Sequence, residues 1–75
     1  MLISGLLIET EKEHKKNALL EIKKIKGLEV TDEYPENKIG LVLESENTEQ
    51  AVGICKQINS LSGVKNLNLV YYHYV

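Results

Sequence analysis

The sequence predicts an α+β fold in which a strand, a helix and a second strand occur twice in succession. Residues 5–9 (GLLIE) and 40–44 (GLVLE) are near copies, and a helical segment follows each of them. A further extended segment comes next in each half, over residues 28–34 and 64–75. Right-handed crossovers then give an antiparallel sheet of four strands in the order 4-1-3-2, with both helices on one face. This arrangement is the ferredoxin-like βαββαβ sandwich.

The first helix is predicted over residues 11–26. Thr10, followed three residues later by Glu13, is typical of a capping box, in which the two side chains satisfy free backbone N–H groups of the first turn. Gly27 suits the left-handed conformation that ends many helices. Apolar residues recur at helical spacing between these ends, with lysines opposite: Ala18, Leu19, Ile22 and Ile25.

The middle of the chain is predicted to be a hairpin. Apolar and polar residues alternate over residues 28–34, as expected of a half-buried strand. The turn lies at residues 35–37, because proline presets one backbone dihedral and Asn37 tolerates a left-handed one. Residues 39–44 form the third strand.

The second helix is predicted over residues 48–60, before the last strand at 64–75. Asn47 with Gln50 repeats the capping pattern at its start, and Gly63 follows its end. One apolar stripe runs along the helix: Ala51, Ile54, Cys55, Ile58 and Leu61.

The period of two along each strand assigns the side chains to two faces of the sheet. The face under the helices receives Leu6, Ile8, Leu28, Val30, Ile39, Leu41, Leu43, Leu67, Leu69 and Tyr71, with His73 on the same side. The opposite face, here called the open face, receives Ile3, Gly5, Leu7, Glu29, Thr31, Glu33, Gly40, Val42, Glu44, Asn66, Asn68, Val70, Tyr72 and Tyr74. We therefore expect an apolar floor with acidic and amide rims.

Two glycines fall on adjacent central strands of this open face. Gly5 and Gly40 would weaken the sheet there, which suggests a flattened spot that another backbone could approach closely. The alternative is that they only ease the twist of the sheet.

The composition limits the protein to one small domain, residues 1–75, and excludes several functions. The formal charge is −2 and there is no arginine, whereas a protein that binds nucleic acid is usually basic and uses arginine. A single cysteine allows no internal disulfide and fits a reducing, cytoplasmic setting. The apolar residues 1–8 lack a basic start and are too short to span a membrane, so we interpret them as a strand.

The side chains available point to binding and away from catalysis. Acylphosphatase-like enzymes of this fold need an arginine for phosphate, RNA-recognition modules need aromatics on the central strands, and metal carriers need a CxxC loop. Cys55 is interpreted as a core residue and His14 as a solvated one. No nucleophile, base and orienting group can be assembled, so the sequence predicts neither an enzyme nor a cofactor or metal site.

Several segments resemble the NapD family of small cytoplasmic chaperones for periplasmic nitrate reductase. They are Ile3-Ser4-Gly5-Leu6-Leu7-Ile8, Gly27-Leu28-Glu29-Val30, and Ser62-Gly63-Val64 leading to Leu69-Val70-Tyr71 with His73 close behind. The likeness covers nearly the whole chain in length and in the order of its elements. The strongest parts are Gly-x-Glu-Val after the first helix and Leu-Val-Tyr near the end.

The resemblance implies a chaperone that binds the twin-arginine signal peptide of the catalytic subunit and delays export until the molybdenum cofactor is loaded. The peptide would contact the open face at Ile3, Gly5, Leu7, Glu29, Thr31, Glu33, Gly40, Val42, Glu44, Asn68, Val70 and Tyr72. Glutamates of this set would pair with the arginines. The alternatives are an amino-acid-sensing module of the same fold, or a module whose open face closes a homodimer.

Overall fold

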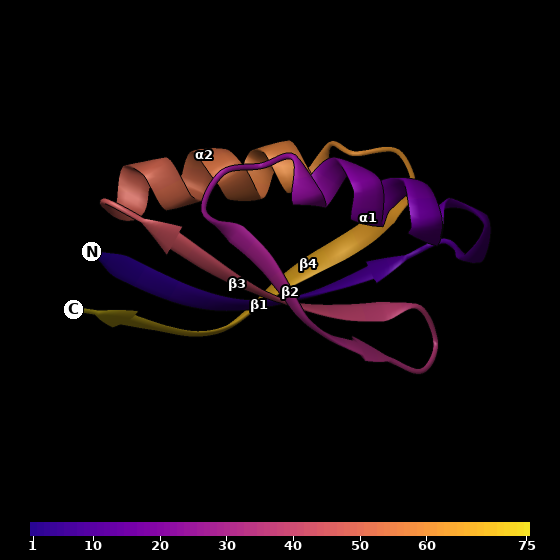
Figure 1. Ribbon diagram of the computed structural model, residues 1–75, viewed down its shortest axis with the longest axis horizontal. Coiled ribbons are helices and arrows are strands. Elements are labelled where there is room, and N and C mark those ends of the chain that lie inside the picture. Colours follow the sequence, from indigo (N-terminus) through magenta and orange to yellow (C-terminus); the bar gives the residue numbers. More distant parts are fainter.

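The computed structural model describes all 75 residues and confirms the ferredoxin-like fold (Figure 1). In chain order the elements are β1 (Leu2–Thr10), the 3-10 turn η1 (Lys12–His14), α1 (Lys15–Lys23), β2 (Leu28–Tyr34), β3 (Lys38–Ser45), α2 (Thr48–Asn59) and β4 (Val64–Tyr74). The antiparallel sheet has the order β2-β3-β1-β4, which is the predicted order read from the other edge. With 12 residues α2 is the longest helix, so no helix here is a candidate for a bilayer span.

Both helices lie on one side of the sheet, and the core fills the space between them (Figure 1). Burial of large apolar side chains there supplies about 1.5–3 kcal/mol each. The buried cluster is Leu2, Leu6, Ile8, Ile22, Ile39, Leu41, Leu43, Ala51 and Ile58. Leu28, Val30 and Leu67 are half-buried against it, so the predicted inward face of β1, β2 and β3 is correct at these positions.

The start of the first helix differs from the prediction. Thr10 does not cap it, because Thr10 is the last residue of β1, is buried, and donates its hydroxyl to the carbonyl of Asn37 at 3.4 Å. A 3-10 turn follows, and the α-helix proper begins only at Lys15. The helix also ends at Lys23, earlier than expected, and Gly27 then takes the left-handed conformation with φ of 86°.

The second helix and the hairpin turn agree closely with the sequence patterns. The Asn47 side chain accepts the N–H of Gln50 at 2.8 Å, and the Gln50 side chain accepts the N–H of Glu46 at 2.7 Å. Asn47 is thus the N-cap of α2. In the hairpin turn both Glu36 and Asn37 have positive φ, at 65° and 61°.

Each edge strand contains a β-bulge that the alternation did not predict. In β4 the register against β1 shifts between Gly5 and Leu6, which pair with Tyr71 and Leu69, so that Val70 is the extra residue. In β2 the register against β3 shifts between Val30 and Asp32, which makes Thr31 the extra residue. A bulge adds one residue to one strand, so every side chain beyond it changes face.

The bulges correct the predicted faces at the ends of both edge strands. In β4, Tyr71 and His73 pair with Gly5 and Ile3 of the open face, whereas Tyr72 and Tyr74 pair with Ser4 and Leu2 under the helices. The predicted sides of all four residues are therefore wrong.

In β2, Asp32 and Tyr34 pair with Gly40 and Lys38 on the open face. Glu33 pairs with the buried Ile39 and forms an ion pair of 3.3 Å with Lys15 of α1. The predicted placement of Glu33 on the open face is therefore also wrong.

Candidate functional site

The open face is the surface of the sheet that no helix covers, and it holds most of the residues predicted to bind the peptide. Ile3, Gly5 and Leu7 of β1 lie beside Glu44, Val42 and Gly40 of β3, in matching pairs. Glu29, Thr31, Asn68 and Val70 join them from the two edges. Ten of the twelve predicted residues thus share this face, and the exceptions are Glu33 and Tyr72.

A tyrosine ring covers each of the two central glycines. A methyl group at Gly5 would overlap the ring of Tyr71, whose Cζ lies 2.6 Å from that position. A methyl group at Gly40 would lie 3.3 Å from Cε2 of Tyr34. An aromatic side chain on a neighbouring strand shields the backbone that a glycine leaves bare. The space at Gly5 is therefore taken by the chain's own Tyr71.

The glycines and the two tyrosines belong to one hollow of about 540 Å³ in the open face. Its lining includes Leu7, Val42, Val70, Thr31, Asp32 and Lys38. The negative charge of Asp32 raises the pKa of the Tyr34 hydroxyl, so that this tyrosine stays neutral over a wider range of pH. The hollow thus combines an apolar floor and two rings with one carboxylate and one ammonium group at its rim.

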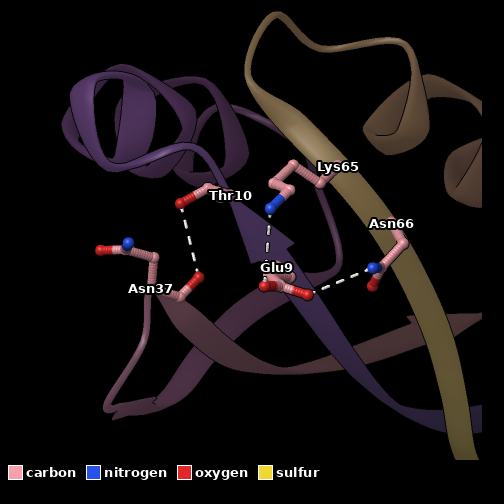
Figure 2. Close-up of polar contacts among 5 residues, drawn as sticks. All are labelled: Glu9, Thr10, Asn37, Lys65 and Asn66. Carbon is pink, nitrogen blue, oxygen red and sulfur yellow. Dashed lines mark hydrogen bonds and ion pairs between the residues drawn. The ribbon is translucent and has the colours of Figure 1, made fainter.

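The charged groups of the open face differ in whether they already have partners. Glu9 accepts a hydrogen bond from Asn66 at 3.2 Å and forms an ion pair with Lys65 at 3.8 Å (Figure 2). Figure 2 also shows Thr10 bonded to Asn37 beside this group. These contacts tie β1 to β4 and to the hairpin turn.

Three other carboxylates, those of Glu29, Asp32 and Glu44, form no ion pair and are exposed. They lie on the two strands at one side of the hollow, β2 and β3. Lys38 is the lysine on that part of the face. The arrangement favours a ligand that is both apolar and positively charged.

Asp32, Tyr34 and Tyr71 are part of this site although the sequence reasoning placed none of them there. A warning was present for Asp32, because strict alternation put this carboxylate under the helices, where an unpaired charge is costly. The run of aromatic residues at 71–74 gave no comparable signal, since every position in it is large and partly apolar.

A second hollow, also of about 540 Å³, lies on the helix side between α2 and β4. Tyr72 and Tyr74 enter it with their rings edge to face and 6.4 Å apart, and the Tyr74 hydroxyl shares a hydrogen bond of 2.5 Å with that of Thr48. Leu69 lies here on its predicted side but is 56% exposed, because no helix covers it. We call this hollow the α2/β4 groove.

Cys55 and His14 were predicted to be a core and a solvated residue respectively. Cys55 packs against the buried cluster, and burial raises the pKa of its thiol. His14 is half-buried against Gly63, and its Nδ1 is buried without a partner, so the prediction of a solvated side chain is wrong. Glu11, Glu13 and His14 bring their ligand atoms within 4.8 Å of one another, a grouping common on surfaces without an ion.

Comparison with known proteins agrees with this fold. The family model described as NapD protein matches residues 1–75. The solution structure of the E. coli Tat proofreading chaperone protein NapD is 20% identical with a TM-score of 0.85, covering 97% of this chain and 78% of that one. The crystal structure of TTHA0845 from Thermus thermophilus is 18% identical with a TM-score of 0.74, covering 100% and 99%. No curated protein matches the chain at the sequence level.

Proposed function

Because this chain belongs to the NapD family, we propose that it is a chaperone that binds the twin-arginine signal peptide of a periplasmic nitrate reductase precursor. Binding delays export until the molybdenum cofactor of that precursor is loaded. The protein acts in the cytoplasm, before export, and does so by binding alone, without catalysis. A proofreading role in the Tat pathway is what the E. coli NapD structure is described as serving, and the present fold matches it.

The observation that carries the proposal is the pairing of an apolar floor with unpaired carboxylates on one free face. A twin-arginine peptide has a basic end and an apolar stretch. Its apolar side would rest on Ile3, Leu7, Val42 and Val70, as an amphipathic helix does in a groove. The basic end would then lie toward the carboxylates of β2 and β3.

The arginines would meet Glu29, Asp32 and Glu44, which form no ion pair within the chain. A guanidinium group can also stack on a tyrosine ring, and Tyr34 lies beside Asp32 at the hollow. Exposed ion pairs contribute about 0–1 kcal/mol each, so most of the affinity comes from the apolar floor. The charges would mainly speed encounter and orient the peptide.

The bulge in β2 supplies a matched pair of variants for testing this site. Glu29 and Glu33 lie on the same strand, but Glu29 faces the hollow side and Glu33 the helix side. We expect Glu29→Gln and Asp32→Asn to slow association with the peptide and to reduce its salt dependence, with affinity falling by up to about fivefold each. Glu33→Gln should bind with unchanged rates.

The assay is stopped-flow mixing with a tryptophan-labelled signal peptide, which is convenient because the protein itself has no tryptophan. A peptide with both arginines changed to glutamine is the control on the ligand side. If Glu33→Gln slowed association as much as Glu29→Gln, the assignment of the site to the open face would be wrong. Binding of free amino acids in place of the peptide would favour the sensing module.

A further inference from the structure

β4 is an edge of the sheet, and most of its length carries no charge. It is the longest strand, with 11 residues, and its outer side faces no other strand. After Lys65, which is paired with Glu9, no acidic or lysine residue occurs to the end of the chain. Six of the exposed large apolar or aromatic residues gather there: Leu69, Val70, Tyr71, Tyr72, Tyr74 and Val75. A long, uncharged, aromatic edge is a template for pairing with another strand.

The opposite edge of the same sheet is protected. β2 has seven residues, and three of them are Glu29, Asp32 and Glu33. Charged side chains on a short edge strand discourage pairing with other chains. The contrast between the two edges shows where the protein tolerates a neighbour and where it does not.

The hydrogen bonds at the chain ends show which backbone groups of β4 point outward. Val75 and Met1 exchange two hydrogen bonds, of 2.8 and 3.2 Å, and so form a hydrogen-bonded pair. Such pairs alternate with non-bonded ones along an antiparallel ladder. Tyr74 and Tyr72, opposite Leu2 and Ser4, are the non-bonded positions, and their N–H and C=O groups face away from β1.

We propose that this outer edge pairs with β4 of a second copy of the chain, antiparallel and about a two-fold axis at His73. Tyr72 of one copy then lies opposite Tyr74 of the other, and each such pair exchanges two backbone hydrogen bonds. On the helix side the tyrosine rings of both copies meet at the mouths of the two α2/β4 grooves. The paired segment, residues 71–75, lies beyond the bulge at Val70, where the strand is regular.

The charge pattern selects a second β4 over other strands of a second copy. Pairing β4 with β2 would set uncharged tyrosines against carboxylates, and it would join copies head to tail into an open chain. Pairing β4 with β4 matches two uncharged strands, keeps the two Lys65 side chains at opposite ends, and closes after two copies.

The pairing leaves the open faces of both copies free on the same side of a continuous sheet of eight strands. It is therefore compatible with peptide binding on those faces and does not depend on it. Because five residues a side make a small contact, we expect a dimer that dissociates on dilution.

The test is sedimentation velocity of the whole chain over a wide range of concentration. We expect the mass to rise with concentration from that of one chain, 8.5 kDa, toward twice that value. Tyr72→Pro removes an outward N–H at an edge position that tolerates proline, so dimerisation should weaken at least about tenfold. Tyr72→Ala keeps the N–H and removes only the ring, so it should dimerise more strongly than the proline variant.

Hydrogen exchange gives an independent readout if the proline variant folds poorly. In the unmodified protein the amides of Tyr72 and Tyr74 should exchange more slowly as concentration rises, while the outward amides of β2 keep their rate. A chain that stays monomeric at every concentration overturns the proposal. So does equal weakening by alanine and proline, or protection of these two amides by the signal peptide without dimerisation.

Discussion

Replacing Gly5 by alanine tests the bulge at Val70, because only the bulge brings Tyr71 over Gly5. Alanine in a strand usually gains about 0.5–1 kcal/mol over glycine, since it loses less conformational freedom on folding. Here the new methyl group would overlap the Tyr71 ring, with Cζ at 2.6 Å, and moving a packed ring costs about 1–3 kcal/mol. We therefore expect a net loss of about 1 kcal/mol, or about 4–8 °C in Tm for a domain of this size.

The sign of this effect should reverse when the ring is absent. In a Tyr71→Ala background, Gly5→Ala should stabilise by about 0.5–1 kcal/mol. The coupling energy of the double-mutant cycle is then about 1–3 kcal/mol. Urea unfolding of the four proteins, followed by far-UV circular dichroism, measures it. Additive changes would refute the bulge, because a regular strand would turn Tyr71 to the other face of the sheet.

Three further predictions concern local features. Gly27→Ala should cost about 2–4 kcal/mol, because φ there is 86° and the new Cβ would lie 2.6 Å from the backbone oxygen of Glu44; its control, Gly53→Ala, has open space and should gain about 0.5–1 kcal/mol in the same urea titration. Asn47→Ala should cost about 1 kcal/mol and lower Tm, through loss of the N-cap bond of 2.8 Å. Because burial raises the pKa of the Cys55 thiol, it should react with a thiol reagent more slowly in the folded protein than in urea, and equal rates would contradict this.

The order of elements, the sheet topology and the central strands followed from sequence patterns. β1 and β3 are regular, so the period of two places Ile3, Gly5, Leu7, Gly40 and Val42 correctly. The cap at Asn47 and the left-handed Gly27 were also predictable, because each depends only on residues close in sequence.

The ends of the edge strands were not predictable in the same way. Each bulge depends on pairing with a strand distant in the chain, and it leaves no mark in the spacing of Tyr71 to Tyr74 or of Asp32 to Tyr34. The Thr10 cap failed for a related reason. Thr10 matches a capping box locally, but its place at the end of β1, beside Asn37 of the hairpin turn, takes its hydroxyl away from the helix.

The central claim, that the open face binds a twin-arginine signal peptide, is tested most directly by methyl NMR. Titration with the peptide should shift the methyl signals of Ile3, Leu7 and Val42, while those of Val52 and Leu69 in the α2/β4 groove stay in place. The reverse pattern would place the peptide in the groove and contradict the account. No shift at any methyl would contradict peptide binding altogether.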